Sequence, residues 1–440
     1  MPQPPRPIPR SVPRSGRRLR VSPKKAPPVK YKPYKMREPK VLWLIPVVLI
    51  LGFGVVLAFF AAEEMKTSKL QAAYLSALAS EIRFELRNGP NPAMRVPVAG
   101  PYNQRLGYSY MPDYIKSLEA DGYTIAQQMR ASEVYNTLLR YGVYPIYHAK
   151  TVTGLNLLDR LEQPLYAASY PAHVLTDFQS IAPLLVNTLL YIENRELLEP
   201  GPVTRNPVIE WKRFLYAAFG HFLQGLAPGL NAGGGSTLAT QIEKFRYSPG
   251  GQTGSAMEKL RQIASASLRV YMDGPDTRAS RARIVLDYLN STPLSARPGF
   301  GEINSIGDGL WAWFGHDPND VMKALNLPET DANSLRIKAS VYREVLGLVL
   351  AQRRPSTYLV SSREELDNLT DAARDRLAEA GGISSALSQA SHAARFRFLP
   401  EAPQPPQTAF LDQKAANTLR THLLGMLGLK KLYELDRLDL

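Results

Sequence analysis

The longest uninterrupted apolar stretch of the chain lies near its N-terminus. Residues 41–62, VLWLIPVVLILGFGVVLAFFAA, contain no charged residue. A helix of this length spans roughly 30 Å, which is the thickness of the hydrocarbon core of a bilayer. A cleaved signal peptide has a shorter apolar core, so the pattern predicts a retained transmembrane helix.

Beyond this stretch, apolar residues recur at spacings of three and four, which predicts that the helix continues until Gly89-Pro90. The chain then becomes rich in turns and aromatic residues, with short strand-like runs such as GVYPIYHAK at 142–150. We expect residues 63–176 to form a membrane-proximal helix and a small α+β module. A mere spacer is the alternative.

From residue 177 to 362 the apolar pattern is mainly helical, which predicts one α-rich domain. Its clearest helical segments are residues 177–198, 206–226, 255–272, 278–290 and 335–352. The third of them opens with a capping box, Ser255 and Glu258. Residues 363–440 read as a helical segment, a Pro-rich linker and an amphipathic end, which either starts a further domain or pairs with a partner that the sequence does not identify.

The net charge of +14 suggests nucleic-acid binding, but its distribution argues against that function. Residues 1–40 carry 13 Lys and Arg and one acidic residue, which leaves about +2 for the other 400 residues. This Pro-rich tail is expected to be disordered. Its positive charge predicts a cytoplasmic N-terminus, with the remainder of the chain on the other side of the membrane.

The chain has no cysteine, which excludes disulfides and thiolate chemistry, and its six histidines show no metal-binding spacing. Glu193 is the first candidate for chemistry, because it follows a strongly apolar helical stretch. Such a carboxylate is either a solvated helix end or a general base in a partly dry cleft, where burial favours proton uptake.

A second candidate is the stretch NAGGGSTLATQIEKF at 231–245. Its glycines allow the backbone to approach a ligand closely, and Ser236 or Thr237 can cap the following helix. Free N–H groups at a helix start, with Lys244 nearby, favour a phosphate group. An ordinary turn with an N-cap is the alternative, and the spacing excludes a P-loop.

In combination these features resemble the family 51 glycosyltransferases, the peptidoglycan glycosyltransferase domains of class A penicillin-binding proteins and their monofunctional relatives. Glu193-Asn194 stands at the family's first motif. The second motif is matched by Gly234, Gly235, Ser236, Thr237, Gln241 and Lys244. The third is matched by Lys259 and Gln262, and the fourth resembles residues 283–290, which end in Asn290.

The resemblance implies a mainly helical, lysozyme-like domain that polymerises a lipid-linked disaccharide-peptide at the bacterial inner membrane. Glu193 is then the base, and the matched glycines, polar side chains and lysines hold the diphosphate. The implied partners are the lipid-linked precursor, glycan strands, the membrane and other cell-wall proteins. The resemblance identifies no cofactor with certainty, and a divalent metal, Mg or Mn, is left open.

The sequence also departs from the family pattern. Asn194 replaces an acidic residue, Gln262 replaces a Glu, and helical spacing puts Arg261 nearly opposite Lys259. The alternatives are therefore a non-catalytic scaffold that binds glycan or precursor and a lysozyme-like cleaving enzyme. A transferase requires Glu193 and Lys244 to face one groove, and a cation that seals Glu193 away would exclude it.

Overall fold

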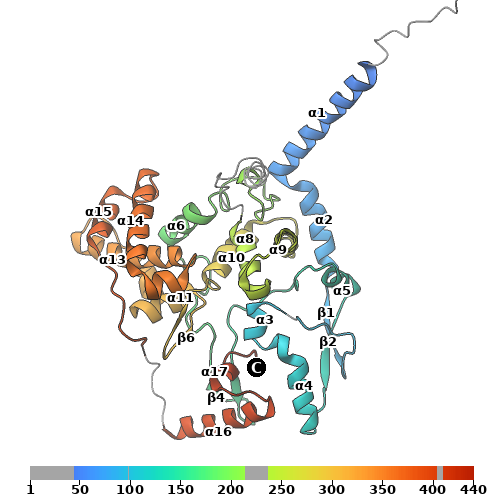
Figure 1. The fold of residues 1–440 in the computed structure, drawn as a ribbon, viewed down its shortest axis with the longest axis vertical. Coiled ribbons are helices and arrows are strands. Elements are labelled where there is room, and N and C mark those ends of the chain that lie inside the picture. The colour runs from blue at the N-terminus through green and yellow to red at the C-terminus, as the bar shows by residue number, and fades with distance from the viewer. Residues whose placement is uncertain (1–43, 98, 214–235, 404–409) are drawn as a thin grey trace, which may run out of the picture. The chain divides into compact units, whose positions relative to one another are not determined.

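The computed structural model describes residues 44–97, 99–213, 236–403 and 410–440. The tail predicted to be disordered (1–40), together with Gly234 and Gly235, therefore lies outside the described residues. The described part of the chain divides into two units, with the boundary between Ala58 and Phe59. Helices dominate the described part and its strands are short, which confirms the mainly α prediction (Figure 1).

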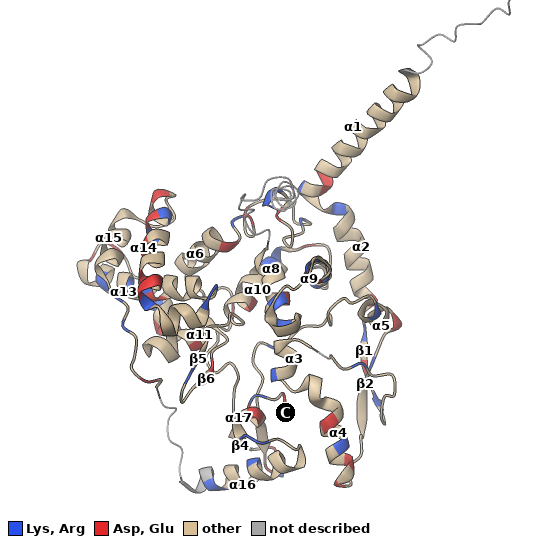
Figure 2. Cartoon of the chain, viewed as in Figure 1, with Lys and Arg blue, Asp and Glu red and all other residues tan. Residues whose placement is uncertain are grey.

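Helix α1 (Leu44–Thr67) contains the N-terminal apolar stretch. The part from Ile45 to Thr67 has a mean hydropathy of 2.7 and is long and apolar enough to cross a membrane. Figure 2 shows charged residues on this helix only near its C-terminal end. Its large apolar side chains are exposed, as a helix surrounded by lipid requires.

The prediction of one continuous helix up to Gly89-Pro90 is wrong. Ser68 has a φ of 50°, a left-handed conformation that ends α1. The next helix, α2 (Lys69–Ser80), is capped by the carboxylate of Glu64, which accepts hydrogen bonds from two amides of its first turn. Helical spacing alone did not reveal this break.

Residues 84–88 then form a strand, because FELRN alternates apolar and polar side chains. Strand β1 (Phe84–Asn88) pairs antiparallel with β2 (Gln127–Ala131), and the second hairpin consists of β3 (Asn156–Leu158) and β4 (Pro164–Ala167). The helices between them are α3 (Pro101–Arg105), the 3₁₀ turn η2 (Tyr108–Tyr110), α4 (Met111–Ala120) and α5 (Glu133–Arg140). The α+β module expected before residue 176 is thus present.

The remaining described elements form the main helical part of the chain. They are α6 (Pro183–Glu193), α8 (Leu238–Tyr247), η3 (Pro249–Gly251), α9 (Ala256–Val270), α10 (Arg278–Leu289), β5 (Ala296–Arg297), β6 (Gly301–Glu302), α11 (Ile306–Gly309), η4 (Leu310–Phe314), α12 (Pro318–Leu325), α13 (Ala332–Ala351), η5 (Thr357–Ser361), α14 (Arg363–Glu379) and α15 (Ser385–Ala393). The cap expected from Ser255 is present, since its hydroxyl accepts from the Glu258 amide.

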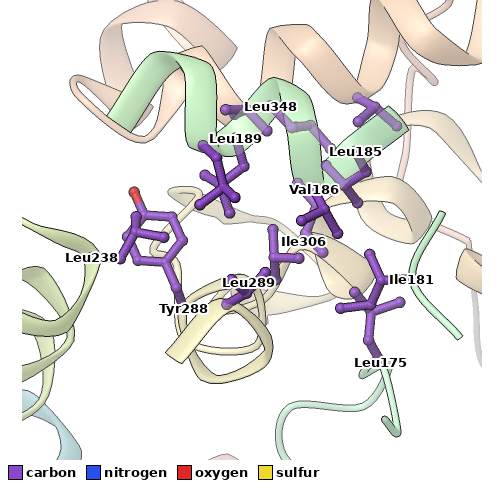
Figure 3. Packing of buried hydrophobic residues seen from close by; sticks show 14 of the residues in the cluster. Leu175, Ile181, Leu185, Val186, Leu189, Leu238, Tyr288, Leu289, Ile306 and Leu348 are labelled. Atoms are coloured by element: carbon purple, nitrogen blue, oxygen red, sulfur yellow. The ribbon is translucent and has the colours of Figure 1, made fainter. Parts of the chain in front are cut away.

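The central core holds α6 in place. Leu185 and Leu189 of α6 are fully buried and pack near Tyr288 of α10 and Leu348 of α13 (Figure 3). Each buried aliphatic side chain stabilises the fold by about 1.5–3 kcal/mol, so α6 is firmly anchored. Helices α14 and α15 contribute to the same cluster, so this core extends past residue 362.

The C-terminal residues pack against the α+β module. Helices α16 (Phe410–Met426) and α17 (Leu432–Leu435) bring Leu435 and Leu438 into a small buried cluster with Leu155. Asp439 accepts hydrogen bonds from Lys150 at 2.8 and 2.9 Å. The amphipathic end therefore pairs with another part of the same chain, one of the two expected outcomes.

We predict a pH-dependent contribution to stability from His316. Its imidazole lies 3.0 Å from the buried carboxylate of Glu344 on α13, and this hydrogen bond raises the pKa of His316 above its usual value. The stabilisation is present below about pH 6.5 and is lost as the pH rises through the raised pKa. His316→Gln should therefore lower the free energy of unfolding by about 1 kcal/mol at pH 5.5, and by less at pH 8.5.

Urea denaturation at both pH values measures this difference. His422→Gln is the control, because His422 is exposed and takes part in no ion pair among the described residues. An equal loss of stability at pH 5.5 and 8.5 in His316→Gln would contradict the assignment.

Candidate active site

Glu193 is the last residue of α6, a mainly apolar helix whose other polar residues are Asn187 and Thr188. The residue is only 9% exposed, so it is not the solvated helix end that was the alternative interpretation. Because the preceding turns of α6 are buried in the core, the position of this carboxylate is well defined.

Three side chains donate hydrogen bonds to the Glu193 carboxylate. Gln241 of α8 donates to Oε2 at 3.0 Å. Gln352 and Arg353, which follow α13, donate to Oε1 at 3.2 and 3.0 Å. The sequence predicted Gln241 as a site residue, but it did not identify Gln352 or Arg353.

Arg353 is a cation in contact with the Glu193 carboxylate. If Arg353 shielded both carboxylate oxygens from an acceptor hydroxyl, Glu193 could not be the base of a transferase. The Arg353 side chain is 49% exposed and that of Glu193 is 11% exposed, so the pair lies at the edge of the solvent-accessible surface. A carboxylate has about four acceptor positions, and three are occupied here. Arg353 donates to Oε1 only, and Oε2 has a single donor among the described residues, so Oε2 retains an acceptor position.

Lys244 and Lys259 form the cationic part of the site. The charge of Glu193 acts on Lys244, although burial has the larger effect and lowers the Lys244 pKa. Burial, with the nearby charge of Lys244, lowers the pKa of Lys259 to about 8. Neither lysine forms an ion pair within the part of the chain that the structure describes. Two close, partly buried cations without a counter-ion favour binding of an anion.

Ser236 and Gln262 complete the surroundings of Lys259. The Lys259 ammonium donates to the Ser236 hydroxyl at 2.9 Å and lies 3.4 Å from Gln262 Oε1. The amide nitrogen of Gln262 donates to the Ser248 and Thr253 hydroxyls at 3.0 and 2.9 Å. Gln262 is fully buried, and each of its polar atoms has a partner. We call Ser236, Lys244, Lys259 and Gln262 the lysine cluster.

The expectation of free N–H groups at the start of α8 is wrong for its first residues. Thr237 is the N-cap, and its hydroxyl accepts from the Thr240 amide, while the Thr240 hydroxyl accepts from the Thr237 amide. The Leu238 amide donates to Asn194 Oδ1 at 3.0 Å. These three amide donors are occupied, so they are not available to an anion.

Asn194 has a structural position that accounts for its neutral side chain. While its oxygen caps α8, its amide nitrogen donates to the carboxylate of Glu210, a residue that is only 4% exposed. Arg213 in turn bonds Glu210 and the backbone oxygen of Glu193. An Asp at position 194 would bring two carboxylates together and would lose a donor. Sequence reasoning had not identified Glu210 or Arg213.

Replacing Asn194 by an acidic residue, the type that the family has at this position, should therefore destabilise the protein. We predict that Asn194→Asp lowers the free energy of unfolding by about 1–3 kcal/mol, because a buried hydrogen bond to a charged group becomes a repulsion. Urea denaturation measures the change. The double variant Asn194→Asp/Glu210→Gln restores a donor and should recover much of the loss; the absence of recovery would contradict this explanation.

Arg261 and Asn290, two further residues singled out from the sequence, lie away from the lysine cluster. Arg261 is 45% exposed and lies close to Gly142 of the α+β module, as its position on the other face of α9 predicted. Asn290 bonds the backbone of Leu175 in both directions, at 2.9 and 2.7 Å, and is buried. Their proposed substrate-binding roles gain no support from this geometry.

No group of three or more His, Asp or Glu side chains that could hold a metal ion was found among the described residues. The polar groups next to Glu193 are instead donors and cations. Assistance by Mg or Mn stays an untested prediction.

The comparisons with known proteins agree with the motif order. The sequence pattern of the Transglycosylase family matches residues 162–377, a range that contains Glu193, α8 and the lysine cluster. A search of curated proteins found no match. Residues 162–377 therefore form a transglycosylase domain of glycosyltransferase family 51, and this domain contains Glu193 and the lysine cluster.

Proposed function

We propose that the chain is a membrane-anchored peptidoglycan glycosyltransferase that polymerises lipid-linked disaccharide-peptide and releases polyprenyl diphosphate. The observation that carries this proposal is that Gln241 of α8 bonds Glu193, while Lys244 of the same helix lies within its electrostatic influence. One helix thereby joins the base candidate to the cations that would hold a diphosphate.

In the proposed reaction, the 4-hydroxyl of the acceptor sugar gives its proton to Glu193. The hydroxyl oxygen attacks the anomeric carbon of the donor with inversion, and the bond from that carbon to the diphosphate oxygen breaks. Lys244 and Lys259 stabilise the charge that the leaving diphosphate gains in the transition state. Gln241 and Gln352 hold the Glu193 carboxylate so that Oε2 remains open to the acceptor.

The membrane arrangement is part of the proposal. Helix α1 anchors the protein in the bacterial inner membrane, with the basic tail in the cytoplasm and the transglycosylase domain outside. An anchor keeps the domain near a substrate that stays in the bilayer, which raises the effective concentration. The expected partners are the lipid-linked precursor, glycan strands and other cell-wall proteins.

A non-catalytic scaffold is the second candidate. It is favoured by the Arg353–Glu193 ion pair and by Gln262, which has no charge where the family has a carboxylate. A cleaving enzyme has less support, since it usually needs a second carboxylate. The carboxylate of Glu210 is already bonded to Asn194 and Arg213.

Incubation of the full chain in detergent micelles with purified lipid-linked disaccharide-peptide tests the proposal. Glycan polymer together with polyprenyl diphosphate is the expected result. Bound but unreacted precursor would favour the scaffold. Shortening of added glycan strands without polymer would favour the cleaving enzyme, and either of these outcomes would overturn the transferase.

A further inference from the structure

A large cavity lies outside the site described above. Its volume is about 810 Å³, within the range of pockets that hold small organic ligands. Most of its lining residues belong to the α+β module between Phe84 and Tyr147, before the range matched by the family. The others come from the end of α8, the following turn and the first turns of α9.

Tyrosine is the most frequent residue type in this lining, which includes Tyr108, Tyr135, Tyr144, Tyr147 and Tyr247. A tyrosine combines a flat apolar ring with a hydroxyl that can form hydrogen bonds. A pyranose sugar has the complementary form, with C–H groups on its faces and hydroxyls around its rim. The lining is thus suited to sugar rings.

The charged residues of the lining are Arg95, Arg261 and Glu258. Glu258 accepts a hydrogen bond from Tyr144 and lies 3.8 Å from Arg261. Arg95 forms no hydrogen bond or ion pair within the described residues. With two guanidinium groups and one carboxylate, the cavity is suited to a ligand that carries an acidic group.

Buried polar atoms without partners provide an independent observation. Asn103 is 1% exposed, and its amide nitrogen is fixed by a bond to the Ala99 oxygen at 3.2 Å. Its Oδ1 has no partner among the described residues, and neither does the hydroxyl of Tyr247. Both residues line the cavity. Such atoms are costly, and because both lie beneath the accessible surface a bound molecule would satisfy them only after a small shift of the lining.

A chain of hydrogen bonds joins the cavity to the lysine cluster. The amide of Gln262 donates to the Ser248 hydroxyl, and that hydroxyl lies 2.9 Å from the hydroxyl of Tyr144. Tyr144 donates to the carboxylate of Glu258, so the hydroxyl of Ser248 has to donate to that of Tyr144. The donors therefore all point from the lysine cluster towards the cavity.

We propose that this cavity binds an acidic oligosaccharide, namely a segment of glycan chain in which sugars carry carboxylates. The tyrosines take the sugar rings, and Arg95 pairs with a carboxylate. The choice of a glycan rests on the proposed function, because such an enzyme works beside glycan strands, and the muramic acid sugars of a strand carry free carboxylates wherever the peptide has been removed. The α+β module then holds the strand beside the transglycosylase domain.

Isothermal titration calorimetry on the full chain in detergent micelles tests this inference. The two probes are a peptide-free tetrasaccharide of alternating N-acetylglucosamine and N-acetylmuramic acid, and the neutral tetrasaccharide of N-acetylglucosamine. We expect the acidic probe to bind at least about tenfold more tightly, a difference that corresponds to one charge-assisted contact. Equal binding of both probes, or no binding of either, would overturn the proposal.

Two variants locate the binding. Arg95→Gln should remove the preference for the acidic probe. Arg160→Gln, which deletes the same charge at an exposed position outside the cavity lining, should keep it. If both variants lose the preference equally, the effect is one of general charge and the cavity assignment is wrong.

The outcome is separable from that of the proposed function, because the titration requires no turnover. Glu193→Gln is expected to bind the acidic probe as the wild type does. Polymerisation without this binding would refute only the cavity assignment. Binding that depends on Arg95 in a protein without polymerisation would refute only the transferase.

Discussion

Replacement of Glu193 by Gln is expected to lower the rate of glycan polymerisation by about 10²–10⁴-fold, the usual contribution of a general base. The amide has nearly the same shape, so the packing of α6 is preserved. Its oxygen can still accept from one of the donors that now bond the carboxylate. It cannot take a proton from the acceptor hydroxyl, so binding of precursor should persist while turnover is lost.

The measurement compares polymer formed from lipid-linked disaccharide-peptide by the wild type and by the variant. Glu199→Gln is the matched control, since Glu199 is exposed, lies near Glu193 in sequence and forms no ion pair within the described residues. It should retain the wild-type rate. Polymerisation at a wild-type rate by Glu193→Gln would show that this carboxylate is not the base.

Removal of the Lys259 charge is the second change with a large expected effect. Lys259→Met should lower the polymerisation rate by about 10²–10³-fold, similar to the loss of one pre-positioned donor at a charged transition state. Burial with Lys244 nearby lowers the Lys259 pKa to about 8. The ammonium is therefore present below pH 8 and is lost as the pH rises through this value, so pyrophosphate affinity should decline above pH 8.

Loss of the Lys259 charge should lower the polymerisation rate but should not lower the free energy of unfolding. A lysine with a lowered pKa in the folded state costs stability while it is charged, and this cost disappears between about pH 8 and its ordinary value near 10.4. Lys259→Met should therefore be as stable as the wild type at pH 7, or more stable. Loss of activity with an unchanged or raised melting temperature would separate a functional role from misfolding.

Gln262→Glu provides a further test of the Lys259 interpretation. A carboxylate in contact with Lys259 favours the charged ammonium. The pH at which pyrophosphate affinity falls should consequently move upwards in this variant. Lys430→Gln, at an exposed lysine far along the chain, should leave the pH dependence unchanged. An unchanged pH dependence in Gln262→Glu would contradict the role assigned to Lys259.

Several parts of the site could be predicted because they are close in sequence or belong to ordered motifs. Gln241 and Lys244 lie on one short helix, and Lys259 and Gln262 lie on one face of the next. Their spacing already indicated that they could act together. The break at Ser68 and strand β1 were missed, because the same apolar residues fit a helix and a strand over so short a run.

The partners of the carboxylate could not be predicted from spacing. Gln352 and Arg353 are about 160 residues from Glu193 in sequence, and they reach it only because α6 and α13 share one core. The bond between Asn194 and Glu210 likewise depends on how a loop packs beside α8. No local pattern records such contacts, since burial decides which of the many polar side chains need one another.

The sequence alone determined the apolar span and the mainly helical class, because these follow from composition and from spacing along single elements, while Glu193 and the lysines became candidates for base and diphosphate binding through the resemblance to a family. Only the tertiary structure decided that the start of α8 is capped, that Arg353 pairs with Glu193, and that the module and the helices α8 and α9 line a tyrosine-rich cavity. The physical reason is that hydrogen bonds and desolvation of buried groups depend on which distant segments pack together.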